Sequence, residues 1–259
     1  MSETEQREPA GEKLAPMKAQ VYKDPRPKEH FDGYHARVRR AKPNFVYELV
    51  RVATSLYAWT FFRTRSVDAC KVPYEGPVIL APNHFSFMDH FFTGAGIRRR
   101  VQFMAKSQLF AKGMQWIYNP GGVFPVRRGV ADEEAFTTAH AVLSRGGPIV
   151  MYCEGGRSRT GELSEKPKRG IGRLALESGA TVVPVAIHGS SRVRNWKHGK
   201  FPKVVVQYGD PIRWERIDAP TRDLQQAVAD EIFTRIRALY DDLDGRLREQ
   251  GGAAGQPDA

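Results

Sequence analysis

Cysteine is scarce in this sequence of 259 residues, which contains only Cys70 and Cys153. Two thiols cannot form the disulfide framework that stabilises many small secreted domains, so we expect both to be free. The N-terminus also lacks the apolar core of a secretory signal, and the chain contains no internal repeat. These absences favour a cytoplasmic globular protein and exclude the disulfide-rich secreted class.

Acidic residues are outnumbered by basic ones. The chain has 40 Lys and Arg residues against 29 Asp and Glu, which gives a net charge of +11 at pH 7. Such an excess favours an anionic partner: a phosphorylated metabolite, an anionic membrane surface or a nucleic acid. Nucleic acid is the weakest of the three and is not expected as a partner. The bases are dispersed among glycine loops, and neither paired Cys/His ligands nor RNA-binding aromatic strands are present.

A long apolar segment, residues 44–62, is interrupted by Glu48 and Arg51. A membrane-spanning helix needs about 20 apolar residues, and two charges near the start argue against a span. We predict an amphipathic helix over residues 44–66 and leave two interpretations open. The helix could lie among lipid headgroups, because bases flank it and aromatics end it; it could equally pack on a sheet as a core helix. The flanking bases are Arg39, Arg40, Lys42, Arg63 and Arg65.

Between residues 67 and 250, strand-like apolar runs alternate with amphipathic helical periods. This alternation predicts a single α/β domain with a largely parallel central sheet flanked by helices. Polar residues 1–43, with scattered prolines, and residues 251–259 are predicted to be disordered, the former as a basic arm. The strand-like runs lie near residues 77–82, 101–105, 122–126, 148–153, 181–188 and 203–208, and the helices start at Asp132 (as N-cap), Ile171 and Leu224.

A histidine and an aspartate follow the first of these strands. His84 and Asp89 stand five positions apart in the stretch Asn-His-Phe-Ser-Phe-Met-Asp, just beyond the apolar run 77–82. Histidine can act as a general base near neutral pH. A carboxylate on its second ring nitrogen would fix the tautomer and stabilise the imidazolium. Asp89 could also cap a helix. By itself the pair permits a hydrolase, a transferase or neither.

Arginine-containing loops follow two later strands. The run 122–126 leads into Arg127 and Arg128, and the run that begins at residue 148 leads into Glu-Gly-Gly-Arg-Ser at residues 154–158. Glycines let the backbone approach a ligand closely, and guanidinium groups match phosphate oxygens in pairs. We expect a phosphate-bearing ligand at these loops.

The order of these blocks resembles the four-block signature of the glycerolipid acyltransferases, a family that includes the lysophosphatidate and glycerol-3-phosphate acyltransferases. His-x₄-Asp is the first block, the strand that ends in arginine the second, Glu-Gly-x-Arg-Ser the third and Val-Pro-Val around Pro184 the fourth. The resemblance extends from about Gly76 to Asp210. It is close in the first and third blocks and looser in the others.

The resemblance implies roles for individual residues. His84 would be the general base and Asp89 its orienting partner. The residues implied in substrate binding are Arg128, Glu154, Gly155, Arg157 and Ser158. Further positions that could contribute are Arg127, Lys168, Arg169 and Pro184. Glu154 could instead be a structural anchor that pairs with an arginine and holds its loop.

The chain departs from the family pattern in the second and third blocks. Arg127 stands where the family usually has an acidic residue, and Cys153 and Gly156 stand where it usually has proline and threonine. These changes leave the catalytic pair intact and bear on which acceptor fits. Cys153 also permits a rival mechanism in which a thiol nucleophile acts with His84, although a cysteine at the end of a buried strand is usually inert.

The implied reaction transfers a fatty acyl group from a thioester to a hydroxyl of a phosphorylated glycerol acceptor. The acceptor favoured is 1-acylglycerol-3-phosphate, with glycerol-3-phosphate or another lysophospholipid as the alternative. The donor would be acyl-CoA or acyl carrier protein, and the resemblance implies no metal and no other cofactor. The expected location is the cytoplasmic face of the cell membrane, where the protein would bind peripherally to an anionic surface.

Overall fold

The computed structural model describes residues 14–17, 23–110 and 115–253. Its elements, in chain order, are the 3-10 helix η1 (Lys28–Phe31), α1 (Asp32–Arg40), α2 (Phe45–Phe62), β1 (Arg65–Val67), η2 (Ala69–Lys71), β2 (Val78–Pro82), α3 (Asp89–Ala95), β3 (Gln102–Lys106), η3 (Ser107–Leu109), α4 (Gln115–Gly121), β4 (Val123–Val126), α5 (Glu133–Ser144), β5 (Pro148–Val150), α6 (Gly170–Ser178), β6 (Thr181–His188), η4 (Ser190–His198), β7 (Val205–Tyr208) and α7 (Arg222–Ala253).

The strands form one sheet in the order β1-β7-β6-β2-β5-β3-β4. The five strands from β6 to β4 run parallel to one another. β7 is antiparallel to β6, and β1 is parallel to β7. The predicted α/β fold with a largely parallel sheet is therefore confirmed. All six strand-like runs contain a strand. β1 was not predicted, because its three residues form an edge strand and include the exposed Arg65 and Ser66.

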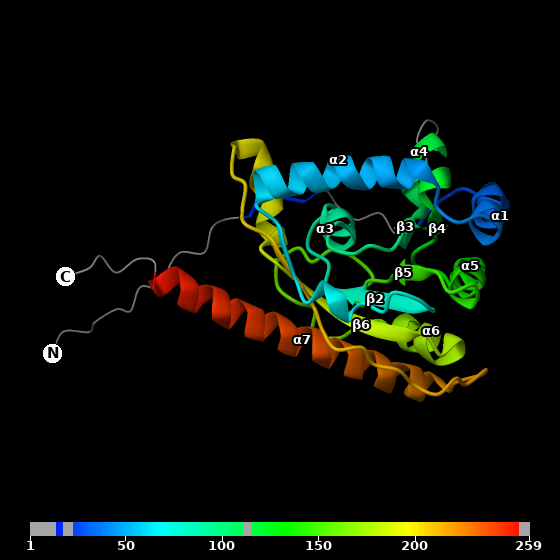
Figure 1. Ribbon diagram of the computed structural model, residues 1–259. Helices are drawn as coiled ribbons and strands as arrows, with labels where there is room; N and C mark the ends of the chain where they lie inside the picture. Colours follow the sequence, from blue (N-terminus) through cyan, green and yellow to red (C-terminus); the bar gives the residue numbers. More distant parts are fainter. Residues whose placement is uncertain (1–13, 18–22, 111–114, 254–259) are drawn as a thin grey trace, which may run out of the picture.

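Helices cover both faces of the sheet (Figure 1), with α2 and α3 over one face and α5, α6 and α7 over the other. Successive residues of β2 point to opposite faces and so contribute to two cores. Val78 and Leu80 pack with Phe92 on the side of α2 and α3. Ile79 and Ala81 pack against the other three helices. Every residue of β2 is buried, which explains its unbroken apolar run.

Part of the arm predicted to be disordered is helical. Residues 28–40 form η1 and α1, and Phe31, Tyr34 and Val38 are buried at helical spacing. Arg145 secures the end of α1 by donating to the Val38 carbonyl (2.6 Å). Three apolar side chains on one face thus bury enough surface to order a segment that is otherwise polar. Residues 1–13 and 18–22 of the arm lie outside the described residues, as do residues 254–259 of the tail, whereas α7 continues to Ala253.

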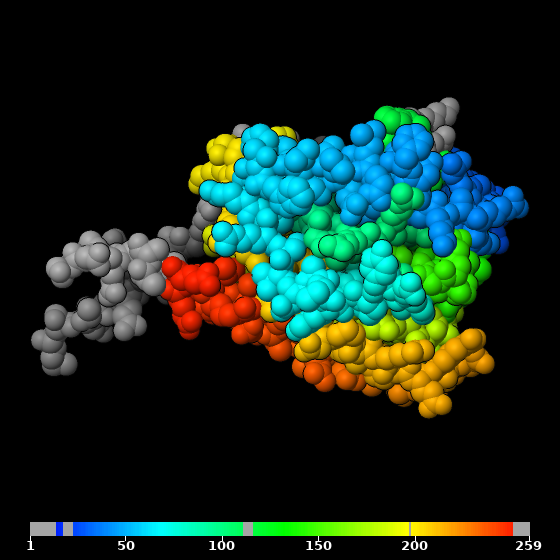
Figure 2. Space-filling model, in the orientation of Figure 1, coloured from blue at the N-terminus to red at the C-terminus, as the bar shows by residue number. Residues whose placement is uncertain are grey.

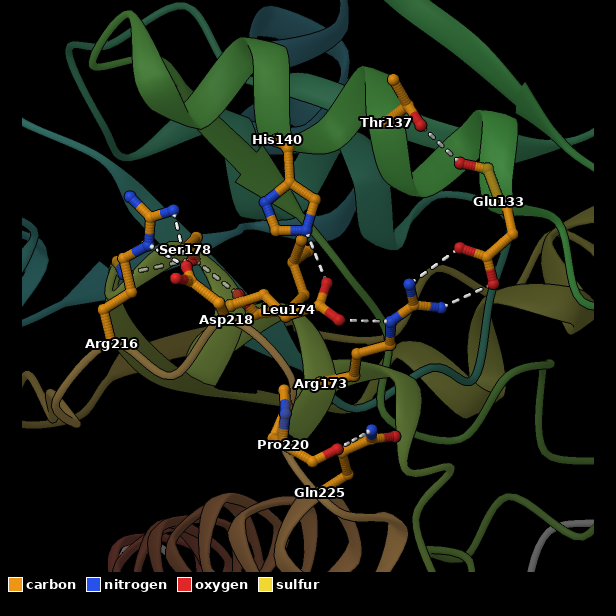
Figure 3. A network of polar contacts seen from close by, with 12 residues as sticks. Glu133, Thr137, His140, Arg173, Leu174, Ser178, Arg216, Asp218, Pro220 and Gln225 are labelled. Carbon is orange, nitrogen blue, oxygen red and sulfur yellow. Dashed lines mark hydrogen bonds and ion pairs between the residues drawn. The ribbon is translucent and has the colours of Figure 1, made fainter.

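Charged side chains join α5 to α6 (Figure 3). The Arg173 guanidinium donates two hydrogen bonds to Glu133 (2.7 and 2.8 Å) and one to Glu177 (2.7 Å). The other Glu177 oxygen lies 2.8 Å from His140 Nε2. A bidentate pair extended in this way holds the two helices in register over the sheet.

Candidate functional site

The candidate site lies where the parallel strands end. Loops that follow parallel strands meet at the carboxyl edge of the sheet, which is where ligands bind in open α/β folds. His84 follows β2, Glu154 and Arg157 follow β5, Lys106 ends β3, and Arg128 follows β4. β2, β5, β3 and β4 are consecutive in the sheet, so these side chains gather at one edge.

His84 and Asp89 are a buried, hydrogen-bonded pair. Nδ1 of His84 lies 2.9 Å from Oδ2 of Asp89, and the two residues are 4% and 0% exposed. The same oxygen accepts the backbone N–H groups of Phe85 and Ser86, each at 2.7 Å. Asp89 is the first residue of α3, but its carboxylate bonds the turn before the helix instead of capping it. With Nδ1 donating to a fixed carboxylate, Nε2 keeps the lone pair that a base needs.

The loop after β5 holds the backbone of His84 from both sides. Oε1 of Glu154 accepts the His84 N–H (2.8 Å), and the His84 carbonyl accepts the N–H of Ser158 (2.9 Å). Oε2 of Glu154 accepts two bonds from Ser164, at 2.6 and 3.2 Å. Glu154 is therefore an anchor between loops, as one interpretation held, although the groups it binds are a backbone N–H and a serine instead of an arginine. Burial raises its pKa.

Gly155 makes the turn at the start of this loop. Its φ is +68°, and an added Cβ would lie 3.0 Å from Cγ of Lys168. The Lys168 N–H in turn bonds the carbonyl of Cys153 (2.7 Å). The loop therefore folds back on itself, and glycine is required at this position because a side chain would be strained there.

Positive charge surrounds the imidazole of His84. Burial lowers the pKa of His84, its bond to Asp89 opposes that effect, and the charges of Arg128 and Arg157 lower it further. The same two guanidinium groups, after burial, also lower the pKa of Lys106. Arg128 and Arg157 therefore lie close enough to act on both the His84 imidazole and the Lys106 ammonium group. Lys106 was not among the predicted site residues. The feature of the sequence that could have identified Lys106 is its position at the end of a strand that runs parallel to the strand before His84.

The other predicted site residues make local contacts in the same loops or are exposed to solvent. The Ser158 hydroxyl accepts the Gly161 N–H (3.1 Å) and so closes the loop. Arg127 donates its N–H to Asp132 (2.7 Å), with its guanidinium 3.8 Å from the same carboxylate. Asp132 occupies the N-cap position of α5, but its side chain makes this contact instead of the predicted cap. Lys168 and Arg169 are exposed just before α6.

Pro184 is not at the edge of the sheet. It lies buried inside β6, paired with Ala81 of β2. A neighbouring contact that sequence reasoning missed is made by Asn83, whose amide exchanges two hydrogen bonds with the backbone of Ile187 (2.7 and 3.1 Å). A fully buried side chain thereby continues the pairing of β2 with β6 beyond Pro82 and delivers His84 to the edge.

Cys153 is fully buried and packs in the core shared with α5, α6 and α7. Burial, with a smaller effect of Glu154, raises the pKa of its thiol well above the ordinary value. A protonated, enclosed thiol is a poor nucleophile, which disfavours the rival covalent mechanism. Among the residues that the structure describes, no group of three His, Cys, Asp or Glu side chains is placed to hold a metal ion.

Helix α2 has one buried face and one exposed apolar face. Tyr47, Ala58 and Phe62 are buried on its inner face. On its outer face lies a row of apolar side chains, each more than half exposed: Phe45, Leu49, Val52, Leu56 and Trp59. Figure 2 shows α2 uncovered along one side of the molecule. The inner face thus agrees with a helix packed on the domain, and the interpretation of the helix as membrane-interfacial stays a prediction. Within the described ranges, no helix is long and apolar enough to cross a membrane.

Known proteins resemble the chain over the region that contains His84, Arg128 and Glu154. Residues 63–188 match the family model described as Acyltransferase. A chloroplastic 1-acyl-sn-glycerol-3-phosphate acyltransferase of Arabidopsis thaliana is 23% identical over 198 residues, which cover 73% of this chain and 54% of that protein. A counterpart from Brassica napus is 23% identical over 60% of this chain and 45% of its own length. The chain thus spans about half the length of these plant relatives.

Two bacterial acyltransferases are also similar to the chain. A glycerol-3-phosphate acyltransferase of Aeromonas hydrophila is 27% identical over 56% of this chain and 20% of its own length. The crystal structure of the 1-acyl-sn-glycerophosphate acyltransferase PlsC from Thermotoga maritima superposes with a TM-score of 0.57 at 19% identity, covering 81% of this chain and 88% of that one. The fold is therefore that of PlsC. Residues 63–188 thus match an acyltransferase domain, and in sequence and fold the chain resembles glycerolipid acyltransferases.

Proposed function

We propose that this protein transfers a fatty acyl group from a thioester to a hydroxyl of a phosphorylated glycerol acceptor, 1-acylglycerol-3-phosphate in preference to glycerol-3-phosphate or another lysophospholipid. One observation carries the proposal: His84 is held by Asp89 with Nε2 available, beside Arg128 and Arg157. The names of the relatives support the acyl acceptor class, because they include both 1-acyl-sn-glycerol-3-phosphate and glycerol-3-phosphate acyltransferases.

In the proposed reaction, His84 Nε2 takes the proton of the acceptor hydroxyl while its oxygen attacks the thioester carbonyl. The new C–O bond forms, the C–S bond breaks, and the imidazolium returns the proton to the departing thiolate. Asp89 stabilises the imidazolium between these two transfers. A base of this kind contributes roughly 10²- to 10⁴-fold to the rate.

The cationic group would hold the acceptor phosphate. Arg128 and Arg157 lie near His84, and their charges also act on Lys106. Guanidinium groups bind phosphate oxygens bidentately, so the glycerol hydroxyl would be presented to the base in a defined orientation. Arg127 and Gly156 adjoin this group in the chain and would influence which acceptor fits. The donor, acyl-CoA or acyl carrier protein, is a co-substrate, and the proposed steps use no metal or other cofactor.

The outer row of α2 supports a peripheral position on a membrane. Single exposed apolar residues are common on protein surfaces, but five large ones in a row on one uncovered helix face form a contiguous apolar patch. Basic residues flank the helix at both ends. An anionic surface at the cytoplasmic face of the cell membrane fits this combination. Acceptor and product are themselves lipids, so such a position would place the site where they reside.

The direct test compares the purified full chain with His84→Ala. Labelled acyl-CoA or acyl carrier protein is supplied with a panel of acceptors, and thiol release and labelled product are both measured. We expect transfer to phosphorylated glycerols, and a loss of roughly 10²-fold or more in His84→Ala. Equal transfer by the variant would remove the base assignment. Transfer confined to acceptors without phosphate would remove the role of the arginines.

A further inference from the structure

An aromatic ring covers one face of the His84 imidazole. Tyr152, two residues after β5, stacks on it with ring centroids 3.9 Å apart and planes at 22°. The Tyr152 hydroxyl lies 3.1 Å from Nδ1 of His90, and His90 stacks on Phe103 of β3 at 5.6 Å and 25°. Tyr152 also packs against the core on this side of the sheet. The ring beside His84 is therefore held both by packing and by a hydrogen bond.

We propose that Tyr152 is a positioning residue for His84: its ring fixes the plane of the imidazole and stabilises the imidazolium, and His90 fixes the ring. This inference rests on the proposed function, because it assigns to Tyr152 a task in the reaction of that base. It concerns the contact between His84 of the first block and the ring of Tyr152, which lies just before the third block.

The physical reason lies in the charges that face His84. Asp89 on α3 favours the imidazolium, whereas Arg128 after β4 and Arg157 after β5 disfavour it. Glu154 is occupied by backbone and Ser164 donors. A second carboxylate at the ring would compete with the acceptor phosphate for the two arginines. An aromatic face attracts a cation without carrying a net charge and avoids that competition.

Tyr152 and His90 keep their neutral forms while His84 changes its charge. Burial raises the pKa of Tyr152 well above its ordinary value and lowers the pKa of His90 to about 3. The phenol therefore donates and Nδ1 of His90 accepts throughout the working pH range. The hydrogen bond that holds the ring does not depend on the protonation state of the catalytic pair.

The test uses the full chain with Tyr152→Phe, which keeps the ring, and Tyr152→Met, which fills similar space without one. Two quantities are measured: steady-state kinetics with acyl-CoA and 1-acylglycerol-3-phosphate, and the ¹⁵N chemical shifts of the His84 ring across pH. In Tyr152→Met we expect kcat to fall roughly three- to thirtyfold, the equivalent of one cation–π contact, with the acceptor KM little changed. We also expect the titration midpoint of His84 to fall. Tyr152→Phe should retain the midpoint and lose less activity.

The outcomes separate this inference from the proposed function. If the wild type shows no His84-dependent transfer, the proposed function is wrong. The ¹⁵N titration of His84 would still test the effect of Tyr152 on the imidazole. An unchanged midpoint and unchanged kcat in Tyr152→Met would overturn the inference. A purely structural role predicts a lower melting temperature with no change of midpoint, which would overturn it as well. If Tyr152→Met does not fold, Tyr152→Leu supplies the ring-free comparison.

Discussion

At the scale of single residues, two carboxylates near His84 have different tasks. Asp89 binds the imidazole and two backbone N–H groups through one oxygen, so it sets the orientation of the ring. Glu154 binds the backbone N–H of His84, so it sets the position of the residue. Because Asp89 touches the ring and Glu154 does not, the two carboxylates should differ in their effect on the protonation of His84.

The arginines near His84 predict where activity begins on the pH scale. Burial lowers the pKa of the imidazole, Asp89 opposes that effect and the two guanidinium charges add to it, so the neutral form of the proposed base persists below the ordinary histidine value of 6.5. The acidic limb of kcat/KM should therefore lie below pH 6.5. Arg157→Gln removes one opposing charge, raises the pKa of His84 and should move that limb to higher pH.

Arg159→Gln provides the matched control. Arg159 is exposed in the same loop and is not among the charges that act on His84. Its removal should leave the acidic limb in place. A limb that moves equally in both variants, or in neither, would show that proximity of Arg157 to the base does not set its protonation.

At the scale of elements, α2 combines a buried face with an exposed apolar one. The buried face joins the helix to the domain through Ala58 and Phe62. The side chains of the outer row stay more than half exposed, so the described part of the chain does not cover them. Deleting the helix would therefore remove part of the core together with any membrane contact. Substitutions confined to the outer row test the membrane role without that ambiguity.

The double variant Leu49→Gln/Leu56→Gln should weaken binding to vesicles that contain anionic lipid. Each leucine is worth about 1 kcal/mol when transferred from water into the interface, so binding should fall roughly ten- to thirtyfold in a flotation assay. The control is Ile217→Gln/Leu224→Gln, which changes two exposed apolar residues outside α2. Equal loss in both, or in neither, would argue against α2 as the membrane face.

Close packing of α6 against α7 depends on Gly172. A Cβ at this position would lie 1.9 Å from the carbonyl oxygen of Gln225 and 2.9 Å from the Ala229 nitrogen. Both are backbone atoms of α7 and cannot rotate away. We expect Gly172→Ala to lower the free energy of unfolding by about 1 to 3 kcal/mol, measured by urea denaturation.

Gly245, also in a helix, supplies a comparison of opposite sign. Nothing lies within 4 Å of a Cβ built at this exposed position of α7. Alanine favours helix over glycine, so Gly245→Ala should raise stability by about 0.5 to 1 kcal/mol. Destabilisation of similar size in both variants would mean that helix packing is not what distinguishes them.

At the scale of the whole molecule, stability should decline in mild acid. His35 is buried with Nδ1 2.9 Å from the Thr138 hydroxyl, and burial lowers its pKa to about 4. The unfolded chain, with a value near 6.5, binds a proton between these pH values that the native protein does not. Stability from this group is complete above pH 6.5 and falls progressively toward pH 4, by up to about 3 kcal/mol.

Comparison with His35→Asn isolates this effect, because asparagine keeps a hydrogen-bonding group and does not titrate. The difference in unfolding free energy between wild type and variant should be constant above pH 6.5 and should change in favour of the variant as the pH falls to 4. A difference that is independent of pH would show that His35 is accessible to protons in the native state.

The sequence by itself determined the local elements and the chemistry of the blocks. Apolar runs of strand length and helical periods follow from spacing alone, and six strands and helices α2, α5, α6 and α7 lie where those patterns predict. The pairing of His84 with Asp89 was also accessible, because one short turn joins the two residues. The helical part of the arm was missed because its polar composition concealed three apolar residues on one face.

Only the tertiary structure decided which distant residues meet. The bond from Glu154 to the His84 backbone, the stack of Tyr152 on the imidazole and the approach of Lys106 each join segments from different strands. It also decided that α2 keeps one apolar face uncovered. The physical reason is that local patterns encode the period and burial of an element, whereas the order of strands in the parallel sheet determines which loops share its carboxyl edge.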